Sequence, residues 1–240
     1  MTHSIFVSDL HLDPARPRAN EIFFDFAARI APRAEALYVL GDLFEYWVGD
    51  DDLDDPFNAS VADALARVAA NGVALYFMHG NRDLLAGEAF LRRCNARLIH
   101  DPTLVALYGR SVLLMHGDTL CTADVEYQRF RARARDPRFQ REILSLPLER
   151  RRAEVLAMRA ASERHKQQTA GEIMDVSPEA VEQALRSHGY PLLIHGHTHR
   201  PARHVHVVDG RECERWVLTD WYGRAGYLRC DASGCAAVAL

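Results

Sequence analysis

The sequence predicts an α/β fold in which strands and helices alternate and one long helical segment interrupts the series. Two observations carry this prediction. Short apolar runs recur along the chain, and each is followed directly by glycine or by polar side chains. Between these runs, apolar residues fall at the spacing of amphipathic helices. A rhythm of strand, polar tip and helix is typical of a layered α/β domain.

Five apolar runs are expected to form the central strands: residues 4–7, 37–40, 74–78, 112–115 and 192–194. Helical patterns over 20–30 and 59–71 separate the first three runs. A short helix at 88–93 and a hairpin-like stretch at 97–107 lead to the fourth run. After the fifth run, expected strands at 205–208 and 216–218 flank Asp209-Gly210, which is a hairpin turn signal. Short strands at 227–230 and 236–240 follow.

No strand-like run occurs between residues 123 and 189. Helices are expected there near 123–135, 139–145, 148–169 and 178–188, the last starting at the capping sequence Ser177-Pro178. We therefore predict a core made of residues 1–122 and 190–240, with 123–189 as a helical insertion. Residues 129–166 hold twelve basic and five acidic side chains, so a chain of net charge −4 carries −11 outside this segment.

The composition is that of an ordinary globular protein, with 240 residues, 48% hydrophobic and 26% charged. No apolar run reaches the ~18 residues of a membrane-spanning helix, and the first residues enter a strand without a basic leader. We therefore expect a cytoplasmic chain. The five cysteines include no C-x-x-C pair and are expected to be reduced thiols. The negative net charge and the absence of a reader motif argue against nucleic-acid binding.

Side chains that can bind metal follow all five central runs. Ligand sites of α/β folds collect at the carboxyl ends of strands, so these tips can converge although they are far apart in sequence. Seven donors suit two ions bridged by Asp42, and mixed oxygen and imidazole donors favour Mn²⁺, Fe²⁺, Co²⁺ or Zn²⁺. Two such ions can activate water and clamp a phosphoryl group. The expected ligands are Asp9, His11, Asp42, Asn81, His116, His195 and His197, with His199 outside the set.

In order, the tips resemble the motif blocks of calcineurin-like metallophosphoesterases: D-x-H, G-D, G-N, H-G and G-H. The resemblance implies a sandwich of two mixed sheets flanked by helices and a di-metal hydrolase. One position departs from the pattern, because Arg82 stands where the superfamily usually has a histidine that helps to protonate the leaving group. An arginine keeps its proton at physiological pH but can bind a phosphate through two N–H groups. Arg82 therefore favours a phosphate leaving group and a pyrophosphate substrate.

A narrower resemblance covers nearly the whole chain. Residues 8–12, 41–45, 79–83, 116–118, 173–176 and 195–201 are similar to blocks of the UDP-2,3-diacylglucosamine pyrophosphohydrolases of lipid A biosynthesis. The resemblance implies hydrolysis of UDP-2,3-diacylglucosamine to UMP and 2,3-diacylglucosamine 1-phosphate (lipid X), with a metal hydroxide attacking the UMP-side phosphorus. It also implies two Mn²⁺ per chain and a peripheral position on the anionic cytoplasmic face of a Gram-negative inner membrane. The helical insertion would cover the acyl chains as a lid.

Carried over residue by residue, the resemblance assigns catalytic roles to Asn81, Arg82 and His116. The implied substrate contacts are Asn81, Arg82, Asp124, Ser162, Lys166, Thr169 and His195. The family usually has lysine at the position of Thr169, whereas this chain has its lysine one helical turn earlier, at Lys166.

Two other functions stay open: a metallophosphoesterase of another specificity, and a non-catalytic binding module with this fold. Arg82 argues against the first, and the full donor set argues against the second. The basic helices could bind anionic lipid or face solvent. Their apolar side chains could form core or line an acyl pocket: Phe130, Phe139, Ile143, Leu144 and Leu146. The acidic loop at 50–55 is expected to be a solvated turn.

Overall fold

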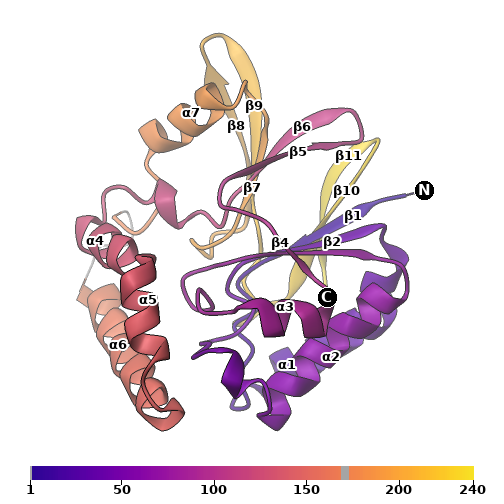
Figure 1. Cartoon of the computed structure of the whole chain (residues 1–240). Coiled ribbons are helices and arrows are strands. Elements are labelled where there is room, and N and C mark those ends of the chain that lie inside the picture. Colours follow the sequence, from indigo (N-terminus) through magenta and orange to yellow (C-terminus); the bar gives the residue numbers. More distant parts are fainter. Residues whose placement is uncertain (1, 169–172) are drawn as a thin grey trace.

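The computed structural model describes the backbone of residues 2–168 and 173–240, and the side chains of 2–160 and 173–240. Two mixed sheets lie face to face, and helices lie on the outer face of each (Figure 1). This arrangement confirms the predicted α/β sandwich.

The six-stranded sheet carries the first three central strands. In spatial order its strands are β11 (Gly234–Ala239), β10 (Gly226–Asp231), β1 (Ser4–Val7), β2 (Ala36–Leu40), β3 (Ala74–Met78) and β4 (Arg97–Leu98). β1, β2 and β3 run parallel, so their carboxyl ends lie at the same edge. Successive side chains of a strand face opposite sides. Ile5 therefore packs against the helices and Phe6 against the second sheet, which explains why the strand is apolar throughout Ile5–Val7.

The five-stranded sheet carries the other two central strands. Its strands are, in spatial order, β5 (Thr103–Leu107), β6 (Arg110–Leu114), β7 (Leu192–His195), β9 (Arg211–Val217) and β8 (Ala202–Val208). Asp209-Gly210 forms the predicted turn between β8 and β9, and both residues have the positive φ of a type I′ turn. The hairpin expected at 97–107 is wrong, because β4 pairs with β3 in one sheet and β5 with β6 in the other.

Helices close both outer faces. α1 (Pro17–Asp25), α2 (Pro56–Ala70) and α3 (Glu88–Cys94) cover the six-stranded sheet. α7 (Pro178–Ser187) covers the five-stranded sheet, where Val181 and Leu185 pack with Leu193. Short helical turns complete the core: a π-helical turn at Phe26–Ile30 and 3-10 turns at Ala31–Arg33, Asp50–Asp52 and Asp118–Leu120.

The remaining helices form a separate layer beside the core (Figure 1). They are α4 (Val125–Ala134), α5 (Pro137–Leu144) and α6 (Leu148–Gln168), close to three of the predicted helices. The fourth predicted helix, α7, packs on the five-stranded sheet. Among the described residues, no helix is both long and apolar enough to cross a membrane.

The acidic loop is not the solvated turn that we expected. Asp51 and Asp52 form ion pairs with Arg151 and Arg152 of α6, and Asp50 accepts hydrogen bonds from the backbone at the start of α3. These carboxylates join two helices that are distant in sequence, and single-sequence patterns do not show such pairing.

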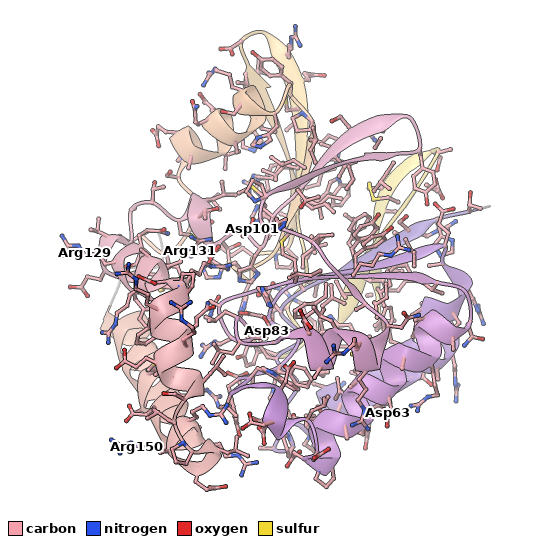
Figure 2. All side chains as sticks on the ribbon, in the orientation of Figure 1. Asp63, Asp83, Asp101, Arg129, Arg131 and Arg150 are labelled. Carbon is pink, nitrogen blue, oxygen red and sulfur yellow. A yellow bond between two sulfur atoms is a disulfide. The ribbon has the colours of Figure 1, made fainter. Side chains whose placement is uncertain are left out.

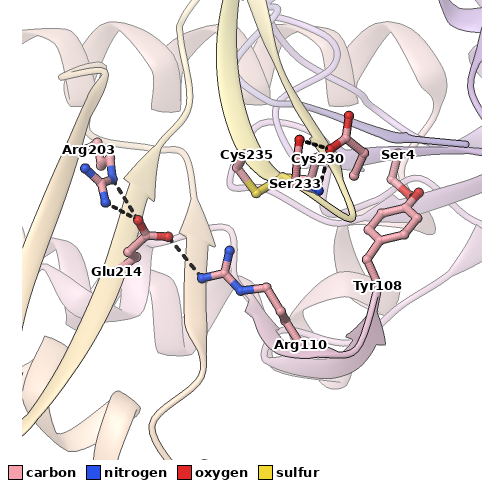
Figure 3. The surroundings of a disulfide bond; sticks show 9 residues. Ser4, Tyr108, Arg110, Arg203, Glu214, Cys230, Ser233 and Cys235 are labelled. Carbon is pink, nitrogen blue, oxygen red and sulfur yellow. Dashed lines mark hydrogen bonds and ion pairs between the residues drawn. A yellow bond between two sulfur atoms is a disulfide. The ribbon is translucent and has the colours of Figure 1, made fainter. Parts of the chain in front are cut away.

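The expectation that all five cysteines are reduced is wrong for one pair. Cys230 and Cys235 form a disulfide between β10 and β11 (Figure 3), where the hairpin register places them directly opposite each other. The other three, Cys94, Cys121 and Cys213, are free and buried.

Leu185→Ala should lower the free energy of unfolding by about 2–5 kcal/mol, because it leaves a cavity between α7 and the sheet. The exposed neighbour Gln183 provides the control, and Gln183→Ala should change stability by less than about 0.5 kcal/mol. Urea denaturation of both variants measures this, and equal effects would contradict the packing.

Candidate metal centre

The polar tips after β1, β2, β3, β6 and β7 meet where the two sheets adjoin. Backbone hydrogen bonds fasten the tips to one another. The N–H of Asp9 donates to Gly41 O (3.1 Å), that of His11 to Asp42 O (3.0 Å), and that of Gly196 to His116 O (2.8 Å). The last bond joins the tips of the adjacent parallel strands β6 and β7. The side chains that follow the strands therefore belong to one rigid framework.

Five side chains of this framework project from residues with positive φ. The angles are 54° at Asp9, 49° at His11, 55° at Asp42, 71° at His197 and 55° at His199. Residues other than glycine rarely adopt this region, and each such residue costs about 1–3 kcal/mol that the surrounding structure must offset. Among the described residues, nine other than glycine have positive φ, and five of these thus lie in one site. Such clustering is typical of functional sites.

Two motif glycines are required because the tips approach so closely. A Cβ atom on Gly80 would lie 2.1 Å from Asp42 Oδ1, and one on Gly196 would lie 2.2 Å from Asp9 Oδ2. Neither carboxylate can move away, because Asp9 and Asp42 are both buried. The glycines therefore let backbone pack directly against the carboxylates.

One group of donors surrounds Asp9. His199 Nε2 lies 3.3 Å from Asp9 Oδ1 and 3.2 Å from His11 Nε2. His11 Nε2 is also 3.9 Å from Asp9 Oδ1 and 3.8 Å from Asp42 Oδ2. The ligand atoms of Asp9, His11 and His199 lie within 4.8 Å of one another, close enough for one ion to contact all three.

A second group lies on the other side of Asp42. Its Oδ1 atom is 3.9 Å from His116 Nε2. Asn81 Oδ1 lies 3.1 Å from both His116 Nε2 and His197 Nδ1. Oδ2 of Asp42 faces the first group and Oδ1 the second, so the carboxylate lies between the two groups.

In two of the imidazoles, the ring nitrogen that faces away from the site contacts a polar group that orients the ring. His116 Nδ1 donates to the carbonyl of Leu40 (2.9 Å), which leaves its Nε2 lone pair for the site. His11 Nδ1 lies 3.4 Å from Glu45 Oε2, and that buried carboxylate also accepts a hydrogen bond from Tyr222 Oη. Partners of this kind fix the ring and increase its basicity as a metal ligand.

The electrostatics of the site are those of buried carboxylates among imidazoles. Burial would raise the pKa of Asp9, but its hydrogen bond with His199 and the charges of nearby histidines hold that pKa well below its usual range. Burial raises the pKa of Asp42 despite the opposing charge of His116. Burial would lower the pKa of His116, yet Asp42 and the other carboxylates raise it to about 9. Burial and the neighbouring His116 lower the pKa of His197 to about 3, so this ring is neutral.

The donor set fits two divalent cations. It consists of two carboxylates, one amide oxygen and four imidazoles, and both carboxylates are buried, where unpaired charge is costly. Hard oxygen donors mixed with imidazole and without thiolate suit Mn²⁺, Fe²⁺, Co²⁺ or Zn²⁺. Asp42 between the groups gives each ion a complement of about four protein donors.

The structure exchanges the roles expected for His195 and His199. His195 is the last residue of β7, where strand alternation places it on the same face as Leu193, away from the donor groups. Its Nδ1 atom donates to Gly196 O (2.9 Å), and its Nε2 atom accepts from Arg215 (3.1 Å). Both ring nitrogens are thus engaged outside the site, and His195 lines neither of the cavities described below.

A signal in the sequence could have shown this exchange. The pair His197-x-His199 lies after the strand, like Asp9-x-His11, and only residues beyond a strand end are free to turn into the site through positive φ. Three other residues that contact the site were also missed: Glu45, Tyr127 and Tyr222.

Two neighbouring cavities adjoin the metal-ligand groups. A polar cavity of about 210 Å³ is lined by donor residues together with Asp124 and Arg200. An apolar pocket of about 100 Å³ lies between the core and α4–α6, where Phe130, Phe139 and Ile143 line it. The two cavities share three lining residues: Asn81, Arg82 and Tyr127. A molecule could therefore reach from the metal-ligand groups into the apolar pocket.

The structure places only some of the predicted substrate residues. Asn81, Arg82 and Asp124 line the polar cavity, and Asp124 also caps α4 by accepting a hydrogen bond from Tyr127 N. Thr169 and the side chains of Ser162 and Lys166 lie outside the described residues. Leu144 is exposed and Leu146 is partly buried, and neither lines the apolar pocket.

Many basic residues of the α4–α6 layer face carboxylates of the core. Arg131 and Arg135 approach Asp118, and Arg159 contacts Glu45 at 3.0 Å, in addition to the pairs made by Arg151 and Arg152. In Figure 2 Arg131 lies between α4 and the core, whereas Arg129 and Arg150 extend from the outer side of the layer. The charge asymmetry of the sequence thus corresponds in part to contacts between the layer and the core.

Comparisons with known proteins agree with this site. A family profile described as "Calcineurin-like phosphoesterase" matches residues 3–201. A protein of Aromatoleum aromaticum named UDP-2,3-diacylglucosamine hydrolase is 54% identical over 231 residues, which cover 96% of this chain and 94% of that protein. Proteins with the same name from Stenotrophomonas maltophilia (48% identical, 96% of each chain) and Cellvibrio japonicus (46% identical, 98% of this chain and 97% of that protein) match as well.

His199→Gln should lower the metal content of the reconstituted protein from about two ions per chain to about one, because it removes an imidazole from the group around Asp9. His195→Gln is the matched control, since a glutamine amide can still donate to Gly196 O and accept from Arg215. It should retain both ions. Elemental analysis after dialysis measures the content, and loss of metal from the His195 variant alone would reverse the assignment.

Proposed function

Because this chain belongs to the calcineurin-like phosphoesterase family, and within it to the UDP-2,3-diacylglucosamine hydrolases, we propose that it hydrolyses UDP-2,3-diacylglucosamine in lipid A biosynthesis. The bond cleaved is the pyrophosphate, and the products are UMP and 2,3-diacylglucosamine 1-phosphate. One observation carries the proposal: the metal-ligand groups open into an apolar pocket through Asn81, Arg82 and Tyr127. A substrate with a pyrophosphate at one end and acyl chains at the other matches this sequence of surfaces.

We propose two Mn²⁺ ions as the cofactor. Two divalent ions would supply activation of water and neutralisation of the phosphoryl oxygens. The residues that would hold them are Asp9, His11, Asp42, Asn81, His116, His197 and His199, a set revised from the sequence prediction by the geometry of His195 and His199.

The chain's own residues bind and orient the pyrophosphate. The Arg82 N–H donates to Asp42 Oδ1 (2.8 Å), which fixes the backbone beneath its side chain. The guanidinium lines both cavities, so it can neutralise the phosphate that leaves with the lipid half. A phosphate leaving group needs no proton, and Arg82 stays protonated and so would donate none. Asp124 is placed to accept hydrogen bonds from sugar hydroxyls in the polar cavity.

The helical segment is proposed as a lid over the acyl chains. Its α4–α6 layer supplies the apolar wall of the pocket, whereas α7 packs on the sheet. The same layer exposes Val125, Leu144 and Leu156 together with Arg129 and Arg150. Exposed apolar and cationic side chains suit the surface of an anionic bilayer, so we propose peripheral association with the cytoplasmic face of the inner membrane. Ser162, Lys166 and Thr169 remain proposed substrate contacts.

Metal-stripped protein should hydrolyse UDP-2,3-diacylglucosamine only after divalent metal is restored, with Mn²⁺ the most effective ion. Asn81→Ala should abolish turnover without unfolding the chain, because it removes a metal donor that is not part of the core.

In ¹⁸O-labelled water the label should enter UMP. Label only in the lipid phosphate would exclude attack on the UMP-side phosphorus.

Hydrolysis of phosphoserine peptides in place of the lipid substrate would indicate another specificity. No turnover with any metal would favour a binding module.

Phe139→Ala should raise KM for the diacylated substrate about tenfold with little change in kcat, since the ring lines the acyl pocket away from the donors. Leu144→Ala on the same helix is the control, because Leu144 is exposed and lies outside the pocket lining. Steady-state kinetics of the two variants decide the point, and an equal KM for Phe139→Ala and wild type would remove the pocket from the proposal.

A further inference from the structure

We propose that Asp118 is a positioning residue that holds helix α4, one wall of the acyl pocket, in register with the metal centre. Binding of the lipid half of the substrate would then depend on a carboxylate that touches neither the substrate nor a metal. The inference rests on the proposed function for the identity of the lipid. The role of Asp118 in holding α4 rests on contacts of the described residues.

Asp118 is buried two residues after the metal donor His116, and its carboxylate faces α4. Its Oδ2 atom accepts hydrogen bonds from Arg131 Nε (2.7 Å) and Tyr127 Oη (3.3 Å), and lies 3.5 Å from Arg135 Nη2. Its backbone carbonyl accepts a further bond from Gln128 Nε2 (2.7 Å). Residues at intervals of three, four and eight lie on neighbouring turns of one helix face. Asp118 therefore contacts side chains from successive turns of α4 and from Arg135, the residue that follows the helix.

The same helix face reaches two other tips of the metal centre. Arg135 Nη2 donates to the carbonyls of His79 and Gly80 (3.3 Å each), directly before Asn81. The Tyr127 ring lies 5.4 Å from the His197 ring, between centroids, and lines both cavities. α4 is thus connected to the tips of β3, β6 and β7 through side chains that Asp118 holds in place.

Apolar packing contributes little to this register. Within α4 only Ala134 is buried, and Val125 and Phe130 are exposed. A helix without a buried apolar stripe depends on its polar contacts for position, and hydrogen bonds to a buried charge are among the stronger ones. The carboxylate of Asp118 is therefore the main fixed point of α4.

The metal donors themselves have other supports. Asp83 accepts hydrogen bonds from Gly80 N and Leu43 N (2.8 Å each), and Arg82 N donates to Asp42. Figure 2 shows Asp83 in the core, apart from Arg131 on α4. Loss of the Asp118 charge should accordingly release α4 while the donors of the metal centre stay in place.

The test uses the Mn²⁺-loaded full chain and the variants Asp118→Asn and Arg135→Gln. Calorimetric titration measures affinity for 2,3-diacylglucosamine 1-phosphate and, separately, for UMP, and elemental analysis gives the metal content. Both variants should bind the lipid product about tenfold more weakly while keeping the UMP affinity and the metal content of wild type. Arg138→Gln, at an exposed arginine of α5 in the same helical layer, is the charge-matched control and should alter none of the three.

Unchanged lipid affinity in both variants would overturn the proposal, and so would loss of metal in parallel with lipid affinity, since Asp118 would then act on the metal centre. Hydrogen exchange of residues 125–134 supplies a readout that needs no lipid. Asp118→Asn should speed exchange across α4, and Arg138→Gln should not. If wild type binds neither product, the proposed function fails, and exchange in α4 still decides whether Asp118 holds the helix. Unchanged exchange would refute that role.

Discussion

The structure depends on burying two carboxylates, Asp9 and Asp42, among imidazoles at the ends of parallel strands. Removing such charges from water costs several kcal/mol each unless opposite charge and hydrogen bonds offset it. Most unusual local features of the chain serve that placement: positive φ at the donor residues, glycines that admit backbone against carboxylate oxygens, and hydrogen bonds between successive tips. A pair of divalent cations completes the compensation that the protein begins with His116 and His199.

Pairing of opposite charges also joins the helical layer to the core. Arg151 is buried and joins Asp51 to the carbonyl of Val48, while Arg159 reaches Glu45, the carboxylate beside His11. The layer is therefore attached by charge at points that adjoin the metal centre. Attachment by ion pairs leaves apolar side chains of the layer, such as Phe139 and Ile143, available to line a pocket instead of a closed core.

The sequence predicts the sandwich and most donors because each donor block directly follows a buried strand, and parallel strands bring their carboxyl ends together. It does not distinguish His195 from His199, since this depends on the residue at which β7 ends and on which face its last side chain points. Pairings between distant segments were missed for a related reason. The Asp51–Arg151 pair and the disulfide of Cys230 depend on the assembled fold or on the register of one hairpin, and neither is encoded by local periodicity.

The departure at Arg82 and the geometry of the cavities support each other. A histidine at this position would be suited to protonate an alkoxide, whereas a guanidinium offers a fixed charge and no transferable proton. The Arg82 side chain lines both the polar cavity and the apolar pocket, where the phosphate of a lipid-linked substrate would join its acylated sugar. Under the proposed function, this places a fixed positive charge where negative charge would build up as the lipid phosphate departs. Under the proposed function, Arg82 is suited to the type of bond cleaved, and the pocket beside it is suited to the lipid attached to that bond.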